Sequence, residues 1–277
     1  MARIIALANQ KGGVTKTTST LSLGAALAER GQRVLLVDLD PQASLTSAGG
    51  VDTAEGDETV YTAMASYMRS GDAPSLDNVV RHVADRLDLL PASIELAGAE
   101  MELMNVGRRE YVLGEVLAVV KGRYDVILID CPPSLSLLTV NALTAADEAL
   151  IPVVPDYLAA RGLGLLLTSI AHTRKIKLNP RLMVRGVILT MVDSRTTHSR
   201  ETMERIHAFL GDRIPVLGEV KRSTKAAEAA AAGLPITAYA PRSDVALAYG
   251  QIADVLVHRW GMAVPEMGAP VEEVARG

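Results

Sequence analysis

Short apolar runs alternate along the chain with longer stretches in which apolar residues recur every three to four positions. The short runs are apolar on successive residues, which is typical of parallel strands buried on both faces of a sheet. They predict strands at 4–8, 33–38, 87–91, 124–130, 150–154 and 182–191. The longer stretches have the period of a helix, and they predict helices at 21–27, 59–69, 94–104, 109–121, 158–175, 199–210, 225–232 and 245–260.

This alternation predicts an α/β fold with a doubly wound, mostly parallel sheet flanked by helices. We expect one domain over residues 1–260 and a flexible C-terminal tail over 261–277, which contains Pro265, Gly268 and Pro270. The polar, glycine-rich stretch 49–58 is expected to be a mobile loop. Ligands of such sheets bind at the carboxyl ends of the strands, so these ends are the place to look for function.

A glycine-containing stretch, Asn9 to Thr18, lies at the first of these ends, between a predicted strand and a predicted helix. Glycines let the backbone approach a phosphate, and the unpaired N–H groups of a helix start point at the anion. Lys16 would then contact the β- and γ-phosphates of a nucleotide, and the Thr17 hydroxyl would ligate Mg²⁺. Gln10 and Thr15 stand where the general phosphate-loop pattern has glycines, so a plain glycine turn opening a helix is the alternative.

Asp130 ends the apolar strand at 124–130. A carboxylate in this position suits Mg²⁺, because hard cations prefer oxygen ligands. Capping of the following turn is the alternative function for this side chain. On the predicted topology Lys16, Asp40 and Asp130 converge at one edge of the sheet.

Two segments resemble the ParA/Soj family of partition ATPases, whose deviant Walker motif reads K-G-G-V-G-K-T-T. They are Lys11-Gly12-Gly13-Val14 ahead of Lys16-Thr17-Thr18, and Val34-Leu35-Leu36-Val37-Asp38-Leu39-Asp40-Pro41-Gln42. The stretch 89–100 is also similar to this family, and the resemblance extends from residue 2 to about residue 260. It implies a P-loop ATPase that binds ATP and Mg²⁺ and is similar to the short Soj-like members, which have no N-terminal DNA-binding extension.

The resemblance also implies roles for single residues. Lys11 would reach the phosphates of a partner subunit across an ATP-bound homodimer, and Asp40 would position the attacking water, so that Lys11, Lys16 and Asp40 are the catalytic candidates. Asp38 would support the magnesium shell. The expected nucleotide-binding residues are Lys11, Gly12, Gly13, Val14, Thr15, Lys16, Thr17, Thr18 and Arg222, and the expected metal ligands are Thr17, Asp40 and Asp130.

Thr15 departs from the family motif, which has glycine at this position. If the position needs a positive φ, a β-branched residue costs about 1–2 kcal/mol of steric strain there. Its Cβ would also crowd the phosphates. We therefore expect nucleotide binding to survive and hydrolysis to be slow, with a chain that does not hydrolyse ATP as the alternative.

A basic region follows in the second half of the chain. Residues 174–225 contain 12 Lys and Arg against 5 Asp and Glu, a net charge of +7, while the whole chain carries −4 and the remainder therefore −11. One basic face on an acidic body is expected. Lys221 to Ala229 aligns with the family segment P-R-N-V-R-L-S-E-A near the adenine base, with Lys221 in place of the proline. The candidate DNA-binding residues, for which solvated surface charge is the alternative, are Arg195, Lys221, Arg222, Lys225 and Arg242.

Composition excludes several classes of protein. Hydrophobic residues make up 49 % of the chain and charged residues 22 %, with a mean hydropathy of +0.21, which indicates an ordered globular protein. The single cysteine, Cys131, excludes an intramolecular disulfide and an all-cysteine metal cluster, is expected to pack in the core, and favours a reducing cytoplasm. The five histidines have no metal-binding spacing. No signal peptide and no apolar run of the ~20 residues needed to cross a bilayer is evident.

Together these features predict a DNA-partitioning ATPase. Its ATP-bound dimer would bind double-stranded DNA non-specifically on the nucleoid, and a ParB-like centromere-binding partner would stimulate hydrolysis and release. The alternatives are a relative that positions a protein cargo, a MinD-like membrane ATPase, and a metabolic enzyme similar to dethiobiotin synthetase or to the nitrogenase iron protein. The acidic tail disfavours membrane binding, the cysteine count disfavours the reductase, and the matches at 221–229 and Arg195 disfavour the ligase.

Overall fold

The computed structural model describes residues 2–193 and 197–263. Within them, one eight-stranded sheet has the order β3-β4-β2-β5-β1-β6-β7-β8. All neighbouring pairs are parallel except β3 and β4, which form an antiparallel pair at one edge. The strands are β1 (Arg3–Leu7), β2 (Val34–Asp38), β3 (Arg81–Ala84), β4 (Leu87–Leu90), β5 (Val126–Asp130), β6 (Glu148–Val153), β7 (Met183–Val192) and β8 (Val216–Lys221).

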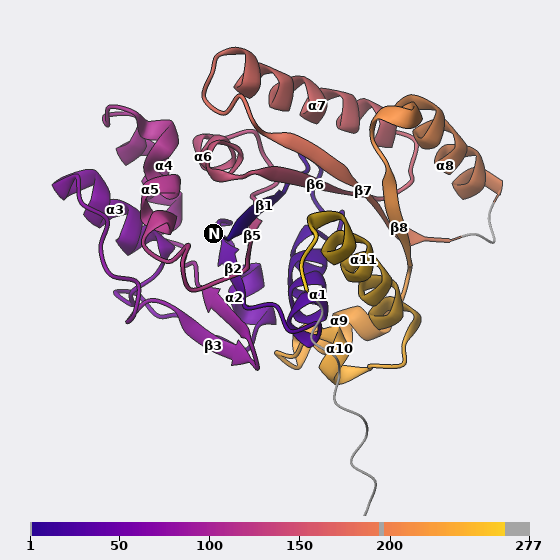
Figure 1. Cartoon of the computed structure of the whole chain (residues 1–277), viewed down its shortest axis with the longest axis horizontal. Coiled ribbons are helices and arrows are strands. Elements are labelled where there is room, and N and C mark those ends of the chain that lie inside the picture. Colours follow the sequence, from indigo (N-terminus) through magenta and orange to yellow (C-terminus); the bar gives the residue numbers. More distant parts are fainter. Residues whose placement is uncertain (1, 194–196, 264–277) are drawn as a thin grey trace, which may run out of the picture.

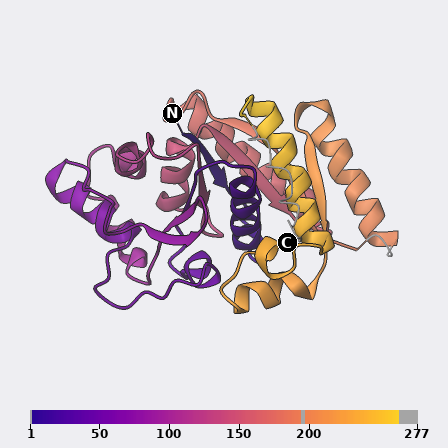
Figure 2. The same ribbon diagram turned by 60° about the horizontal axis from the view of Figure 1, so that its bottom comes forward.

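Helices cover both faces of this sheet, as Figures 1 and 2 show. One face packs against α3 (Val60–Ser70), α4 (Leu96–Leu103), α5 (Val112–Ala118), α6 (Leu137–Ala145), α7 (Ala159–Lys175) and α8 (Thr197–Leu210). The other face packs against α1 (Lys16–Glu29), α2 (Ser44–Ala48), α9 (Thr224–Ala231), α10 (Ile236–Tyr239) and α11 (Asp244–Trp260). Among the described residues, none of these helices is both long and apolar enough to cross a membrane.

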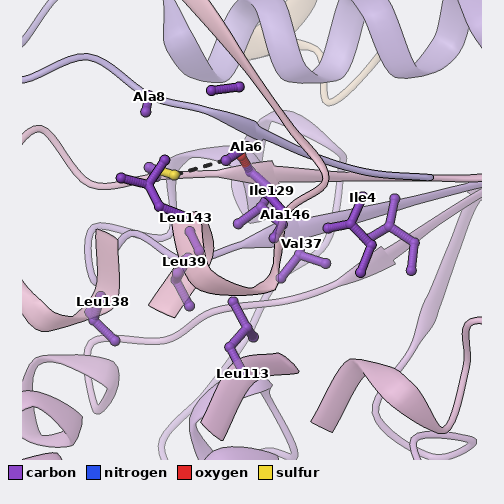
Figure 3. Packing of buried hydrophobic residues seen from close by; sticks show 14 of the residues in the cluster. Ile4, Ala6, Ala8, Val37, Leu39, Leu113, Ile129, Leu138, Leu143 and Ala146 are labelled. Atoms are coloured by element: carbon purple, nitrogen blue, oxygen red, sulfur yellow. Dashed lines mark hydrogen bonds between the residues drawn. The ribbon is translucent and has the colours of Figure 1, made fainter. Parts of the chain in front are cut away.

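The central strands supply side chains to both faces. In β1, Ile4 and Ala6 belong to the core on the α3–α8 side, whereas Ile5 and Leu7 belong to the core on the α1–α11 side. Figure 3 shows the first of these cores, in which Ile4 and Ala6 lie among side chains of β2, β5 and α6. Burial of one such Ile or Leu contributes roughly 1.5–3 kcal/mol to folding. Apolar residues on successive positions of the central strands therefore bury both faces of the sheet.

Cys131 lies in this core, where its side chain is buried. Its Sγ lies 3.9 Å from the backbone oxygen of Ile129, the contact drawn as a dashed line in Figure 3. The expectation of a packed core thiol is confirmed.

The predicted fold class is confirmed, and the predicted strands and helices correspond to observed ones. The prediction missed β3, β8, α2, α6 and α10, and it continued one helix over 109–121, where a short 3₁₀ turn at Arg109–Tyr111 precedes α5. The division into one domain over 1–260 and a tail stays a prediction, as does the mobility of 49–58, and residues 264–277 of the tail lie outside the described residues.

Candidate nucleotide-binding site

The loop between β1 and α1 has an open side. Gly13 has a φ of 72° and Thr15 a φ of 62°, so the chain turns through the left-handed region twice before α1 begins at Lys16. A Cβ added to Gly12 or Gly13 would meet nothing within 4 Å. The backbone is therefore accessible at the start of α1, where unpaired N–H groups and the helix dipole favour an anion.

A cavity of about 380 Å³ adjoins this loop. Its lining includes Gly12, Lys16, Thr17 and Asp40 on the polar side, and small residues of α2 and α9 on the other. The Lys16 side chain is largely enclosed, with the residue only 8 % exposed. Burial lowers the pKa of its ammonium, and the nearby carboxylates of Asp130 and Asp40 act in the opposite direction. The structure thus brings Lys16, Asp40 and Asp130 together.

Asp130 is fixed beneath the loop by hydroxyl groups of α1. Its Oδ2 accepts a hydrogen bond from the Thr17 hydroxyl at 2.7 Å, and its Oδ1 accepts one from Thr20 at 3.2 Å. Burial, together with the charge of Asp38 on the neighbouring strand, raises the pKa of Asp130 to about 7, against the hydrogen bonds and the Lys16 charge. The end of β5 therefore holds a buried carboxyl group whose ionised form Lys16 and the two hydroxyl groups stabilise only in part.

Asp38 is paired with Asp130 in the register of β2 and β5 and is fully buried. Its Oδ2 accepts hydrogen bonds from the Thr46 backbone N–H at 2.8 Å and the Thr46 hydroxyl at 2.7 Å. Its Oδ1 accepts one from the backbone N–H of Asp40 at 3.2 Å. Burial raises the pKa of Asp38 to about 6, and these hydrogen bonds oppose the rise. Asp38 thus holds α2 and the backbone of Asp40 in place.

The Asp40 side chain is half-buried and lines the cavity. Its Oδ1 accepts a hydrogen bond from the backbone N–H of Gln42 at 3.0 Å. The side chain thus borders the cavity with one carboxylate oxygen held by the backbone. This geometry allows Asp40 to orient a water molecule near a bound phosphate.

Lys11 lies at the outer rim of the loop and forms an ion pair with Asp156, which follows β6. The two side chains are 43 % and 35 % exposed, so both partners are in contact with solvent. The Lys11 backbone N–H is held by the Asn9 side chain at 3.0 Å, and Asn9 in turn donates to the Pro152 backbone oxygen at 2.7 Å. The Lys11 ammonium is therefore held by its own chain in this structure.

Thr15 adopts the strained conformation that the sequence raised as a possibility, with φ 62° and ψ 32°. Its hydroxyl donates to the Val14 backbone oxygen at 2.6 Å, and the Thr190 hydroxyl donates to the same oxygen at 3.1 Å. Burial raises the pKa of Tyr249 in α11 to about 12, while hydrogen bonds with Ser19 and Thr15 oppose that rise. The Thr15 hydroxyl is thus engaged with protein groups.

The candidate basic residues near α9 line or flank a second, smaller cavity. This cavity of about 210 Å³ is bounded by Thr15, Thr18 and Met191 on one side and by Lys221 and Arg222 on the other. The two cavities share Thr15 and Thr18 in their linings, so the smaller cavity adjoins the larger one.

Lys221 and Lys225 are exposed but paired within the chain. Lys221 lies 3.0 Å from Asp244, and Lys225 lies 2.8 Å from Glu228. Arg242 is also exposed. Arg195, the remaining candidate, lies outside the described residues.

The expected single basic face is divided by the fold. Arg174 and Lys175 end α7 and precede β7, so they lie near the amino ends of the parallel strands. Lys221 ends β8 and lies at the carboxyl ends of the strands. The charge of segment 174–225 is therefore divided between the two ends of the strands.

Donor chemistry at the loop fits Mg²⁺. The Thr17 hydroxyl and the carboxylates of Asp130 and Asp40 supply the oxygen ligands that this ion prefers. The described residues contain no group of three or more His, Cys, Asp or Glu side chains that could hold a metal ion by themselves. Such an ion would complete its coordination with phosphate oxygens and water, as Mg²⁺ does in nucleotide sites.

Several residues of this site were not found from the sequence. Asp156, Thr46, Thr20 and Tyr249 reach it from separate elements and belong to no local motif. The position of Asp156 just after a buried strand, at the carboxyl edge of the sheet, was the available signal for one of them.

Comparison with known proteins identifies the family. A family model described as an AAA domain matches residues 2–184. The sporulation initiation inhibitor protein Soj of Bacillus subtilis is 44 % identical over 253 residues, which cover 91 % of this chain and 97 % of Soj. The chain belongs to the Soj/ParA family of partition ATPases. The chromosome partitioning protein ParA of Caulobacter vibrioides, 39 % identical over 93 % of this chain and 94 % of its own length, is another relative.

A solved structure agrees with the predicted fold. A crystal structure of cobyrinic acid a,c-diamide synthase from Mycobacterium smegmatis, with bound ADP and magnesium, is 39 % identical and superposes with a TM-score of 0.80. The match covers 94 % of this chain and 96 % of that one. The predicted P-loop ATPase fold and the predicted family are therefore confirmed.

Proposed function

We propose that this chain is an ATPase that binds Mg²⁺ and ATP at the β1–α1 loop and uses them to partition DNA. The observation that carries the proposal is the enclosed Lys16 ammonium beside Asp130, at the start of a helix whose approach is open at Gly12 and Gly13. A lysine, backbone N–H groups at a helix start and a carboxyl group beside them are the groups that a magnesium-bound triphosphate needs.

Each residue of the site has a task in this proposal. Lys16 neutralises the β- and γ-phosphates, and backbone N–H groups of Gly12 to Thr18 bind the phosphate oxygens. Thr17, Asp130 and Asp40 would hold Mg²⁺, which neutralises phosphate charge when it is bound. Asp40 orients the attacking water, and Arg222 contacts the base from the second cavity.

Lys11 acts across an ATP-bound homodimer in the proposed cycle. In this structure it is bound to Asp156 of its own chain. Formation of the dimer would exchange that carboxylate for the phosphates of the partner subunit. In this cycle the ion pair is a contact of the monomer, and the phosphates of ATP on the partner subunit replace it.

The proposed dimer binds double-stranded DNA non-specifically on the nucleoid, and a ParB-like partner stimulates hydrolysis and release. The exposed residues Lys221, Arg222, Lys225 and Arg242, with Arg195, are the proposed contacts to DNA phosphates. The names of the relatives Soj and ParA support a partition function. Strain at Thr15 supports a slow rate of hydrolysis.

The test is binding of a non-specific DNA duplex with ATP, with ADP and without nucleotide, at two salt concentrations, with the mass measured by light scattering. We expect a dimer that binds DNA only with ATP and less well at the higher salt concentration. Lys16→Ala is the control, since it removes the phosphate contact and should bind DNA in no nucleotide state. A wild-type monomer that ignores DNA in every state would contradict the proposal.

An ATP-dependent amide synthase is the second candidate, because a structure at 39 % identity is named as a diamide synthase. With this activity, phosphate release would require a carboxylic acid substrate and a nitrogen donor, and DNA would have no effect. Cys131, the only cysteine, is buried and burial raises the pKa of its thiol, so it does not suit an accessible nucleophile for glutamine cleavage. Ammonia would therefore have to be the nitrogen donor.

A further inference from the structure

An apolar stripe runs along the solvent side of α4 and the turns that flank it, since Ile94 precedes the helix and Met104 follows it. Ile94 is 69 % exposed, Met101 is 66 % exposed and Met104 is 58 % exposed, and Ala97 between them is also exposed. Positions 94, 97, 101 and 104 have the spacing of one helix face, so the four side chains form a continuous row. We call this row the α4 stripe.

The core does not account for the α4 stripe. The opposite side of the helix already packs into the protein through Leu96, Ala99 and Leu103, all fully buried. A surface helix normally has polar residues on its outer side. Contiguous apolar exposure of this kind marks binding surfaces, and methionine adapts its shape to a partner.

A cavity of about 560 Å³ lies at the amino end of the stripe. Ile94 and Glu95 form one wall. Pro41, Gln42 and Asp52, from the segment that follows Asp40, are among the residues of the other wall. The surface therefore combines a row along a helix with a recess large enough for a side chain of a partner.

Three glutamates border the stripe, while Arg109 donates to the backbone oxygen of Met104 at 3.4 Å at its carboxyl end. Glu95 and Glu102 flank it on one side and Glu100 on the other, as the helical spacing requires. Segments 34–68 and 87–107, which supply the helix and the cavity walls, contain 10 Asp and Glu and no Lys or Arg. At the carboxyl end, Arg108 lies 4.8 Å over the Tyr111 ring and Arg109 pairs with Glu110 at 3.2 Å.

We propose that the α4 stripe and the adjoining cavity are a docking surface for a basic amphipathic helix on a partner protein. Such a helix would place apolar residues on Ile94, Met101 and Met104 and lysine or arginine against the flanking glutamates. The acidic border repels nucleic acid and anionic membranes. A second copy that presented the same stripe would bring glutamates against glutamates.

The α4 stripe lies at one end of the molecule, away from α9, which carries the proposed DNA contact Lys225 and packs against α2. Helices α3, α4 and α5 form one end of the molecule and α8 lies at the other, in both views of Figures 1 and 2. Strands β3 and β8 are likewise the two opposite edges of the sheet. The docking surface goes beyond the proposed ATPase, because its binding needs neither nucleotide nor hydrolysis.

The test uses two labelled peptides of about 18 residues, each with leucine at helical a and d spacing, which differ only in their flanking residues, lysine in one and glutamate in the other. Binding is measured by fluorescence anisotropy with the full chain and without nucleotide. We expect the lysine peptide to bind at least about tenfold more tightly than the glutamate peptide. The triple variant Ile94→Ser/Met101→Ser/Met104→Ser should lose at least about tenfold of this affinity.

Two further variants keep the result specific. Glu95→Lys/Glu100→Lys should reverse the preference, so that the glutamate peptide binds more tightly. If thermal unfolding shows that the triple variant is not folded, this double variant provides the test of the proposal. Leu247→Ser, at an apolar position of α11 that is 55 % exposed, should leave binding unchanged. Equal binding of the two peptides, or no effect of either stripe variant, would overturn the proposal. So would self-association of the wild type, in sedimentation velocity, that the triple variant abolishes, because a second copy would then be the occupant.

Discussion

Thr15 is the residue at which this chain departs from its family motif. Its φ of 62° lies in the left-handed region, where a β-branched side chain is sterically strained. The left-handed conformation costs a β-branched residue about 1–2 kcal/mol, and the loop must keep that conformation while it binds phosphate. We expect Thr15→Gly to raise steady-state phosphate release, measured at saturating ATP, because glycine relieves the strain and opens the loop. Unfolding stability should change little, since the entropy cost of glycine, about 0.5–1 kcal/mol, offsets part of the relief.

Thr15→Ala is the matched variant, because it keeps the Cβ and removes the γ-methyl group together with the hydroxyl that bonds to Val14 and lies near Tyr249. If the Cβ at this positive φ slows the reaction, alanine should remain slow. A rate increase in alanine equal to that in glycine would assign the effect to the hydroxyl and the γ-methyl group, and no increase in either variant would mean that Thr15 does not limit hydrolysis.

The pair of Lys11 and Asp156 leads to a second prediction. Both side chains are partly exposed, so each pair contributes about 0–1 kcal/mol, a factor of about 5 at most, and the two pairs lost when a homodimer forms give a factor of about 25 at most. We expect Asp156→Asn to increase the association constant of the ATP-dependent dimer by up to about 25-fold, as light scattering over a concentration series would measure. Asp254→Asn, which breaks the distant ion pair with Arg30, is the control. A lower dimer fraction in Asp156→Asn would show that the carboxylate supports the dimer instead.

Local motifs explain which residues of the site could be predicted from the sequence. Lys16 and Thr17 follow the glycines directly, and Asp130 ends an apolar run, so neighbouring residues identify all three. Asp156 and Thr46 could not be assigned in this way, because their partners, Lys11 and Asp38, lie far away in sequence or across a turn. The roles that the family resemblance implies for these residues remain predictions until the variants are measured.

At the scale of elements, two glycines join α2 to the turn between α9 and α10. A Cβ on Gly50 would lie 2.8 Å from the Gly233 backbone oxygen, and both residues have positive φ values, 74° and 66°. We expect Gly50→Ala to cost about 1–3 kcal/mol more than Gly56→Ala in urea unfolding, because only Gly50 meets another backbone. Gly56 has a φ of 87° and nothing within 4 Å of an added Cβ. Gly56→Ala therefore measures the cost of backbone strain alone, without a steric clash.

The same contact bears on the site, since α2 and α9 both line the 380 Å³ cavity. Separation of the two helices by Gly50→Ala should weaken binding of a non-hydrolysable ATP analogue, measured by calorimetry, while Gly56→Ala should not. Equal stability and equal affinity in the two variants would mean that the helices can move apart without cost.

Elements with strong apolar periodicity could be predicted from the sequence, whereas the edge strands β3 and β8 and the short helix α2 could not. The central strands are buried on both faces, and their apolar runs show this directly in the sequence. β3 and β8 lie at the two edges of the sheet, where Arg81, Glu219 and Lys221 are partly solvated and interrupt the pattern. α2 has only five residues, and Asp38 fixes it through Thr46. Tertiary contacts therefore determine what local periodicity leaves open.

At the scale of the whole molecule, charge is separated between the two edges of the sheet. The acidic segments 34–68 and 87–107 supply the β4 and α4 side, while Lys221 and Lys225 lie at the β8 side near α9. A local surface rather than net charge should then control DNA binding, since the chain as a whole carries −4.

Charge reversal tests this separation. We expect Arg195→Glu/Lys225→Glu to weaken ATP-dependent DNA binding and to lower the slope of log affinity against log salt by about 2, because each lost phosphate contact removes about 0.9. Basal phosphate release should be unchanged, because neither residue belongs to the proposed nucleotide site. Arg69→Glu makes the same kind of reversal on α3, at the acidic end, and should leave both measurements unaltered. If Arg69→Glu weakened DNA binding as much per charge as the double variant, long-range attraction by the whole molecule would govern binding, and the assignment of contacts at the β8 edge would be wrong.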